Sequence, residues 1–153
     1  MLGIVLAVGL PFLIWNLRQH STARKFRRQF IELAGKEGVQ MTKHDIWHKS
    51  YAIALDSKIK KLLYLKREKS DIIPRIINLD HVEGCRIAMT DILDEKKDGS
   101  NPESYKLDLI LHYNNGSNSE LALEFYNNAA FMPSPDDHSH IAKWHRIISE
   151  HIN

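Results

Sequence analysis

Residues 105–126 read YKLDLILHYNNGSNSELALEFY and predict a β-hairpin. In Lys106–Leu111, and again in Glu120–Phe125, apolar residues alternate with charged ones, which is the period of a strand buried on one face. Between the two runs, Asn115-Gly116 is the strongest short signal for a hairpin turn. Strands joined by so short a connection pair antiparallel, so this stretch predicts an antiparallel sheet.

Short strand-like runs separated by turn residues continue on both sides of this hairpin. Asp56-Ser57-Lys58 reads as a turn, and the polar tract of residues 94–104 reads as a long exposed loop. Neighbouring hairpins predict an antiparallel meander of about seven strands. The expected strands are Met41–Lys49, Tyr51–Leu55, Lys61–Lys66, Ile76–Leu79, Cys85–Ile92, Tyr105–Tyr113 and Glu120–Tyr126.

The chain closes with a predicted helix over residues 135–152. Ser134 is a candidate capping residue, Pro135 suits the first helical position, and Asp136-Asp137 supply acids for the first turn. An apolar stripe at helical spacing should cover an open face or end of the sheet. Its members are Ile141, Trp144, Ile148 and Ile152, with Ala142 and Ile147 beside them.

Seven antiparallel strands followed by one amphipathic helix with a central tryptophan resemble the pleckstrin-homology-like fold. The likeness covers about residues 41–152, with Trp144 at the family's recurrent tryptophan and strand segments such as Tyr51–Asp56, Lys61–Leu65 and Leu123–Tyr126. The resemblance implies an α+β fold, in which a curved sheet or split barrel is capped by the C-terminal helix. Its style is that of small membrane-anchored bacterial proteins of unknown role. Phosphoinositide-binding members carry a basic first hairpin loop, whereas Lys49-Ser50 stands there in this chain, so no lipid-binding residue is transferred.

Residues 1–17, MLGIVLAVGLPFLIWNL, contain no ionisable side chain and predict a transmembrane signal anchor. As a helix they reach about 25 Å, the short end of what crosses roughly 30 Å of hydrocarbon. Trp15 stands where an interfacial aromatic is expected, and Arg18 can extend to the headgroups.

Residues 1–17 have two alternative interpretations. A cleaved secretory signal needs early positive charge and a small-residue cleavage site, and neither occurs, so we expect an uncleaved anchor. A buried core helix is the remaining alternative. Because basic residues follow the apolar run, the expected topology is a single-pass membrane protein whose domain is cytoplasmic.

Charge is divided unevenly along the chain. Residues 18–43 hold seven basic and two acidic residues, a balance of +5, whereas the rest holds 14 basic and 17 acidic residues, a balance of −3. The positive charge therefore belongs to the segment beside the anchor. A nucleic-acid-binding domain needs its basic surface on the fold itself, so we expect no nucleic-acid partner.

Residues 18–40 predict a basic juxtamembrane amphipathic helix, and residues 41–153 the folded domain. Ser21-Thr22 are candidate caps, and Gly35 and Gly38 candidate stop signals. The stripe of Phe26, Phe30, Leu33 and Ala34 either lies on lipid or packs on the domain. The residues expected to contact the membrane are Trp15, Arg18, Arg24, Lys25, Arg27 and Arg28.

No sequence motif predicts catalysis. His44 and His48, and the later His138, His140 and His145, lack a zinc-site pattern, so neither a metal nor another cofactor is expected. Acids near turns, Asp80 with Glu83 and Asp91 with Asp94, are expected to be solvated. We expect core packing of the strand aromatics Trp47, Tyr51, Tyr64 and Phe125, and burial of Cys85 as a small hydrophobe. Phe131-Met132-Pro133 is either an exposed apolar lip or a staple on the helix start.

These observations predict a non-enzymatic interaction module that holds a protein, peptide or lipid partner at the cytoplasmic membrane face. Addition of a peptide to a sheet edge is the natural binding mode for such a fold. The alternative is a structural or assembly role in which the domain is a spacer or an oligomeriser. The partner and the oligomeric state are left open by the sequence.

Overall fold

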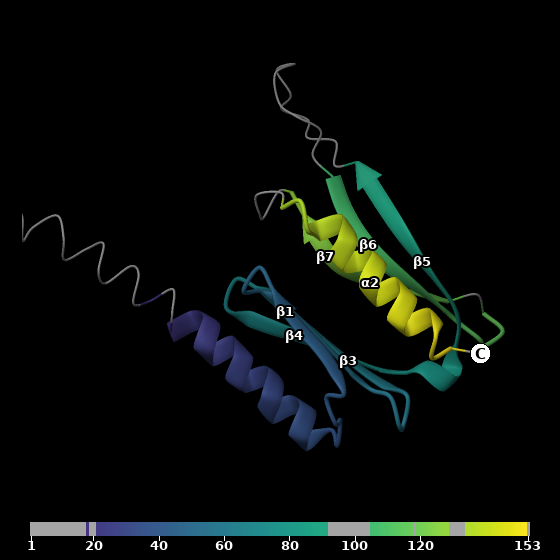
Figure 1. The fold of residues 1–153 in the computed structure, drawn as a ribbon, viewed down its shortest axis with the longest axis horizontal. Coiled ribbons are helices and arrows are strands. Elements are labelled where there is room, and N and C mark those ends of the chain that lie inside the picture. Colours follow the sequence, from purple (N-terminus) through teal and green to yellow (C-terminus); the bar gives the residue numbers. More distant parts are fainter. Residues whose placement is uncertain (1–17, 19–20, 92–104, 118, 129–133, 153) are drawn as a thin grey trace, which may run out of the picture.

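The computed structural model describes Arg18 and residues 21–91, 105–117, 119–128 and 134–152. The predicted anchor (residues 1–17), the polar loop 94–104 and Phe131-Met132-Pro133 lie outside the described residues. The prediction of an α+β chain with seven antiparallel strands and a C-terminal helix is confirmed (Figure 1). The elements are β1 (Lys43–Trp47), β2 (Tyr51–Asp56), β3 (Lys61–Glu68), β4 (Asp71–Asn78), a short 3-10 helix (Leu79–His81), β5 (Val82–Asp91), β6 (Tyr105–Tyr113), β7 (Glu120–Asn127) and α2 (Asp137–Ser149).

The strands form two antiparallel sheets, one in the order β1-β2-β3-β4 and the other in the order β5-β6-β7. Strands that follow one another in the chain are therefore neighbours within each sheet, as the meander prediction required. The predicted strand Ile76–Leu79 was too short, because β4 begins at Asp71 and carries Pro74 opposite Leu65. A proline is tolerated there because β4 is an edge strand.

The first hairpin turn falls within the strand predicted for Met41–Lys49. His48 and Lys49 have φ of 48° and 53°, and the Ser50 amide donates to the Trp47 carbonyl at 3.2 Å. Two successive left-handed residues make a turn whose twist matches that of the flanking strands. The sequence prediction placed this connection at Lys49-Ser50 and carried the strand on to Lys49, because no glycine or asparagine marks where the turn begins.

Strand β2 is covered on both faces, which is why all six of its residues are buried. Tyr51, Ile53 and Leu55 face the main core between the two sheets and α2. The small side chains of Ala52 and Ala54 face the opposite side, where a second core forms under the N-terminal helix, residues 21–36. The first sheet is thus the middle layer of the molecule (Figure 1).

The N-terminal helix uses its apolar stripe on the protein. Phe26, Phe30 and Ala34 are each 1% exposed and pack with Ala52 and Ala54. Among the two interpretations of this stripe, packing on the domain is therefore the one observed. The helix ends at Lys36, and the predicted stop signal Gly38 follows it with φ of +68°, while the Val39 amide donates to the Ala34 carbonyl at 2.8 Å.

The prediction that Ser21-Thr22 cap this helix was wrong. Arg18 is already helical, and the hydroxyls of Ser21 and Thr22 donate to its carbonyl oxygen at 2.9 and 2.8 Å. Such backward bonds are made by residues inside a helix, not by caps. Gly35 also lies within the helix instead of ending it.

Helix α2 closes the main core, as predicted, with Ile141, Trp144 and Ile148 buried. It runs over Asp137–Ser149, shorter than the predicted 135–152, and Asp136 precedes it without a side-chain capping bond. Ser134 belongs to a turn before the helix, where its amide donates to the Asp137 carboxylate at 2.8 Å. Ala142, predicted to lie beside the stripe, is exposed.

Candidate functional site

The predicted membrane-contacting residues lie on the N-terminal helix, except Trp15, which is outside the described residues. Arg18, Arg24, Lys25, Arg27 and Arg28 are all exposed, because the opposite side of the helix is occupied by Phe26 and its neighbours. Arg28 pairs with Glu32 at 4.0 Å. The helix therefore presents cations outward while its aromatic side is unavailable to lipid. No helix among the described residues is both long enough and apolar enough to cross a bilayer.

The outer edge of β5 is the longest unpaired strand edge in the described structure. β5 has ten residues and pairs only with β6 among the described strands. Ile87 and Met89 lie opposite Leu109 and Leu107 of β6, so their side chains point to the same face as that buried pair, toward α2. Ile87 is nevertheless 41% exposed and Met89 63% exposed.

The other edge strands are less suited to pairing with a peptide. On β7, the carbonyls of Glu124 and Phe125 accept hydrogen bonds from the Tyr64 hydroxyl at 2.6 Å and from Trp47 Nε1 at 2.8 Å. β4 carries Pro74, which has no N–H to donate, and β1 has only five residues. On β5, His145 of α2 donates from Nε2 to the Cys85 carbonyl at 3.0 Å. Residues 86–91 therefore form the open part of the β5 edge.

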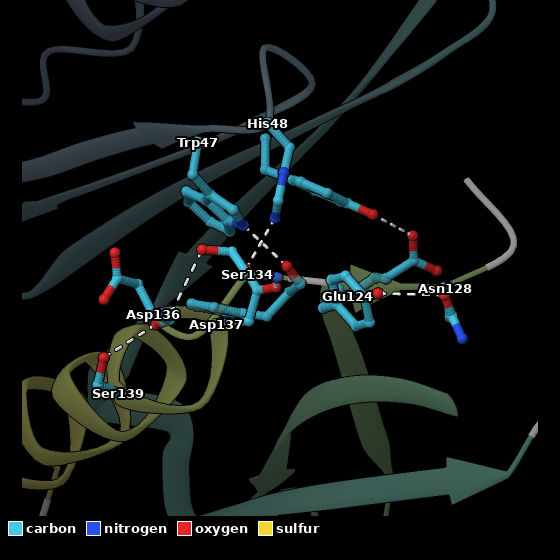
Figure 2. A network of polar contacts seen from close by, with 11 residues as sticks. Trp47, His48, Glu124, Asn128, Ser134, Asp136, Asp137 and Ser139 are labelled. Atoms are coloured by element: carbon cyan, nitrogen blue, oxygen red, sulfur yellow. Dashed lines mark hydrogen bonds and ion pairs between the residues drawn. The ribbon is translucent and has the colours of Figure 1, made fainter. Parts of the chain in front are cut away.

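A polar network joins the first hairpin turn to the start of α2 (Figure 2). His48 Nε2 lies 2.8 Å from Asp137 Oδ1, and Asp137 Oδ2 accepts the Ser134 amide. The ring of Trp47 stacks on Phe125 with 4.8 Å between centroids. The turn, β7 and the start of α2 are thereby held together.

A second polar cluster links the two sheets through Glu124. The Tyr51 hydroxyl donates to Glu124 Oε1 at 2.5 Å, and Lys66 Nζ lies 3.2 Å from the same oxygen. Burial raises the pKa of Tyr51, and the hydrogen bond to Glu124 raises it further. Burial and the charge of Glu124 also raise the pKa of Tyr64. These hydroxyls stay protonated and act as fixed donors, which suits a structural link between sheets.

Asp45 of β1 ties α2 to the first sheet. Its Oδ2 accepts from Lys143 Nζ and from Trp144 Nε1, both at 2.7 Å. Burial alone would raise the pKa of Asp45, but these two hydrogen bonds and the charge of Lys143 outweigh it and lower the pKa. The indole of Trp144 is therefore both buried and hydrogen-bonded.

The predicted histidines do not converge on one point. His44 is exposed, His48 contacts Asp137, and His145 contacts Cys85. His138 lies beside Tyr105, with ring centroids 5.7 Å apart, and His140 lies against Trp47 at 4.5 Å. No group of three or more His, Cys, Asp or Glu side chains in the described ranges is placed to hold a metal ion.

Of the remaining candidates, Tyr51, Tyr64 and Phe125 are core residues, as predicted, and Trp47 is partly buried. Cys85 packs against the core while partly exposed, and burial raises the pKa of its thiol to about 12. Asp80 lies 3.5 Å from Lys60 with about half of its side chain exposed, in line with the solvated acid expected there. Asp94 is outside the described residues.

Sequence reasoning missed the β5 edge and the role of Asp45. The alternation of Cys85, Ile87 and Met89 was visible as a strand, but nothing in it reveals that β5 ends a sheet. The chain matches no protein-family model, no curated protein and no solved structure.

Proposed function

We propose that this chain is a membrane-tethered, non-enzymatic interaction module that binds a partner segment in extended conformation along β5. The observation that carries this proposal is the open edge at residues 86–91 with Ile87 and Met89 exposed beside it. A bound peptide would add a fourth strand to the second sheet, taking affinity from main-chain hydrogen bonds and specificity from alternate side chains.

A pleckstrin-homology-like fold is part of this proposal. Four strands in one sheet, three in the next, and a closing helix with a buried tryptophan agree with the element order of that fold. Helix α2 contacts β5 through His145 and Cys85, and the side chains of a bound strand would lie beside the exposed Ile87 and Met89.

Membrane attachment is proposed from the apolar residues 1–17 and from the outward cations of the N-terminal helix, with the domain in the cytoplasm. Exposed Lys and Arg near an anionic surface each contribute about 1 kcal/mol of attraction. Deletion of residues 1–17 tests the tether. The shortened chain should leave the membrane fraction in a high-salt wash, and its retention there would contradict the anchor.

Site-directed photocrosslinking tests the β5 edge. A benzoylphenylalanine at Met89 in the full chain, expressed at native level, should crosslink one defined segment of another protein. The same probe at Ile76, which is 43% exposed on the first sheet, should not. Ile87→Glu should remove the Met89 adduct because a charge would enter the apolar strip, whereas Ile59→Glu, at a position 51% exposed elsewhere, should leave it.

Equal adducts from Met89 and Ile76 would contradict binding at β5. Adducts formed only with a second copy of this chain would instead favour the assembly role.

A further inference from the structure

A pocket of about 420 Å³ lies between the N-terminal helix and the turn that joins β3 to β4. Its cationic lining residues are Lys25 from the helix, Arg67 from the end of β3, and Lys69 from the turn. Ser21, Thr22 and Ser70 line it as well. No acidic residue among the described ones lines it, so three cationic residues border one half-open pocket.

None of these three cations forms an ion pair within the described part of the chain. Lys69 nevertheless has acidic neighbours, since it also lines a second pocket with Glu68, Asp71 and Glu124. The nearby Lys66 shows the contrast, since it lies 2.6 Å from Glu68 and 3.2 Å from Glu124. Like charges that line one pocket repel one another, so a bound anion would stabilise the arrangement.

Arg67 is held in place but is not satisfied. Its guanidinium Cζ lies 5.8 Å from the centroid of the Phe26 ring, and its Nη2 donates weakly to Ser50 Oγ at 3.4 Å. Its Nη1 is shielded from solvent and has no hydrogen-bond partner among the described residues. The planar guanidinium of an arginine that lines a pocket beside other cations is suited to binding the oxygens of a phosphate group.

The turn adds a strained residue to the same pocket. Lys69 has φ of 55°, a left-handed conformation that a non-glycine side chain rarely adopts. The two-residue hairpin turn between the paired residues Glu68 and Asp71 accounts for this conformation. Here the turn carries Lys69 and Ser70 to the side of the helix that bears Lys25.

The pocket lies at the end of the helix that is nearest to the apolar segment. Ser21 and Thr22 donate to the carbonyl of Arg18, the first residue after the predicted anchor, so the pocket begins one helical turn, about 5.4 Å, from that point. The polar headgroup layer on each side of a bilayer is of similar thickness. The pocket is therefore within reach of a lipid headgroup when residues 1–17 are in the membrane.

We propose that this pocket binds the phosphate group of an anionic membrane lipid, with Lys25, Arg67 and Lys69 as its ligands. About half of the lining residues come from the N-terminal helix, which precedes the seven strands, so the site exists only because this helix packs on the domain. This inference rests on the membrane attachment in the proposed function, and it is independent of peptide binding at β5.

The experiment uses the full chain in neutral detergent micelles doped with phosphatidate, and follows the thermal unfolding midpoint as phosphatidate is added. Saturable stabilisation is expected. Lys25→Gln should weaken the apparent affinity about tenfold, because it removes one charge-assisted contact. The matched control is Arg24→Gln, which removes the same charge from the neighbouring exposed position outside the pocket. Arg67→Gln should weaken binding at least as much as Lys25→Gln.

Equal losses in Lys25→Gln and Arg24→Gln would overturn the proposal, because binding would then follow net charge instead of the pocket. Phosphatidylglycerol at equal negative charge should bind more weakly than phosphatidate if the exposed phosphate is the ligand. Glycerol 3-phosphate and inorganic phosphate test whether a soluble phosphate binds as well as the lipid. Binding of either at the phosphatidate affinity, with the same Lys25 dependence, would overturn the lipid source. Because micelles require neither a bilayer-spanning anchor nor a peptide, failure of this test leaves the proposed function standing.

Discussion

The N-terminal helix and α2 both pack an apolar stripe on a sheet, but different contacts hold them there. α2 adds polar contacts with defined partners: Trp144 and Lys143 donate to Asp45, and His145 donates to the Cys85 carbonyl. In the N-terminal helix, no side chain of residues 21–36 hydrogen-bonds to a strand, and the contacts are those of Phe26, Phe30 and Ala34. Helix α2 is therefore held in one position by directional hydrogen bonds, whereas the N-terminal helix is held by the packing of its apolar side chains.

The two helices also differ in what their polar side chains do. The polar side chains of α2 are used to close the core, whereas those of the N-terminal helix remain exposed and positively charged. The N-terminal helix, with its pocket that contains Lys25 and Arg67, is therefore better suited to binding a ligand at the surface than α2 is.

Trp144→Ala should cause the largest loss of stability, at the top of the range of about 3–5 kcal/mol for removal of a large buried aromatic. Trp144 has no exposed surface and contacts both sheets' core residues, so its removal leaves a cavity at the centre. Urea unfolding followed by circular dichroism measures it. Trp144→Phe is the control and should lose less; a loss from Trp144→Ala smaller than that from Phe30→Ala would reverse the comparison.

Phe30→Ala should cost about 3 kcal/mol, at the bottom of the same range, because the outer helix can close over the small residues beneath it. The effect should also be local. Native-state hydrogen exchange should rise in residues 21–36 while α2 and β6 stay protected. Equal loss of protection in α2 would show that the two cores unfold together.

Asp45→Ala should cost about 1–3 kcal/mol, because it leaves the buried Trp144 Nε1 without an acceptor. Asp45→Asn keeps an acceptor oxygen and should lose less. The free energy of unfolding of both variants, measured in the wild-type and Trp144→Phe backgrounds, isolates the bond. If Asp45→Ala lowered the free energy of unfolding equally in the Trp144→Phe background, which lacks the indole N–H, the hydrogen bond would not contribute to holding α2 in place.

His140→Phe should give the smallest effect, and one that depends on pH. Burial against Trp47 lowers the pKa of His140 below its ordinary value of 6.5, although the charge of Asp45 partly opposes this. The folded state therefore binds its proton less readily than the unfolded chain. Stability is then full above about pH 6.5 and falls as the pH drops toward the folded pKa.

In His140→Phe this part of the pH dependence should disappear, as urea midpoints at about pH 7.5 and about pH 5.5 will show. The exposed His44→Gln is the control and should keep the wild-type slope. An unchanged slope in His140→Phe would assign the pH dependence to other groups.

The strand pattern was predictable because it depends on local alternation. The range Tyr105–Tyr113 was predicted to the residue, and Gly116, with φ of 72°, lies in the expected turn. The errors arose where tertiary structure overrides local signals. The predicted strand Ile76–Leu79 left out residues 71–75, which include the edge residue Pro74, and His48-Lys49 turns without the residues that usually permit it.

The candidate sites were predictable only as single residues. The sequence singled out Lys25 as a membrane contact, but Arg67 and Lys69 follow it by more than forty positions and meet it only through the seating of the helix on the sheet. The openness of the β5 edge likewise depends on strand order and on which carbonyls are already bonded. Neither property has a local signature.

The alanines beneath the N-terminal helix have a mechanical consequence. By letting the helix lie flush on the sheet, Ala52 and Ala54 make residues 21–36 a strut of about 24 Å that is continuous with the domain. A flexible linker would let a tethered domain explore a large volume, which lowers its effective concentration near any one target. Under the membrane attachment proposed above, a helix packed on the domain would hold it at a more constant distance from the bilayer than a flexible linker would.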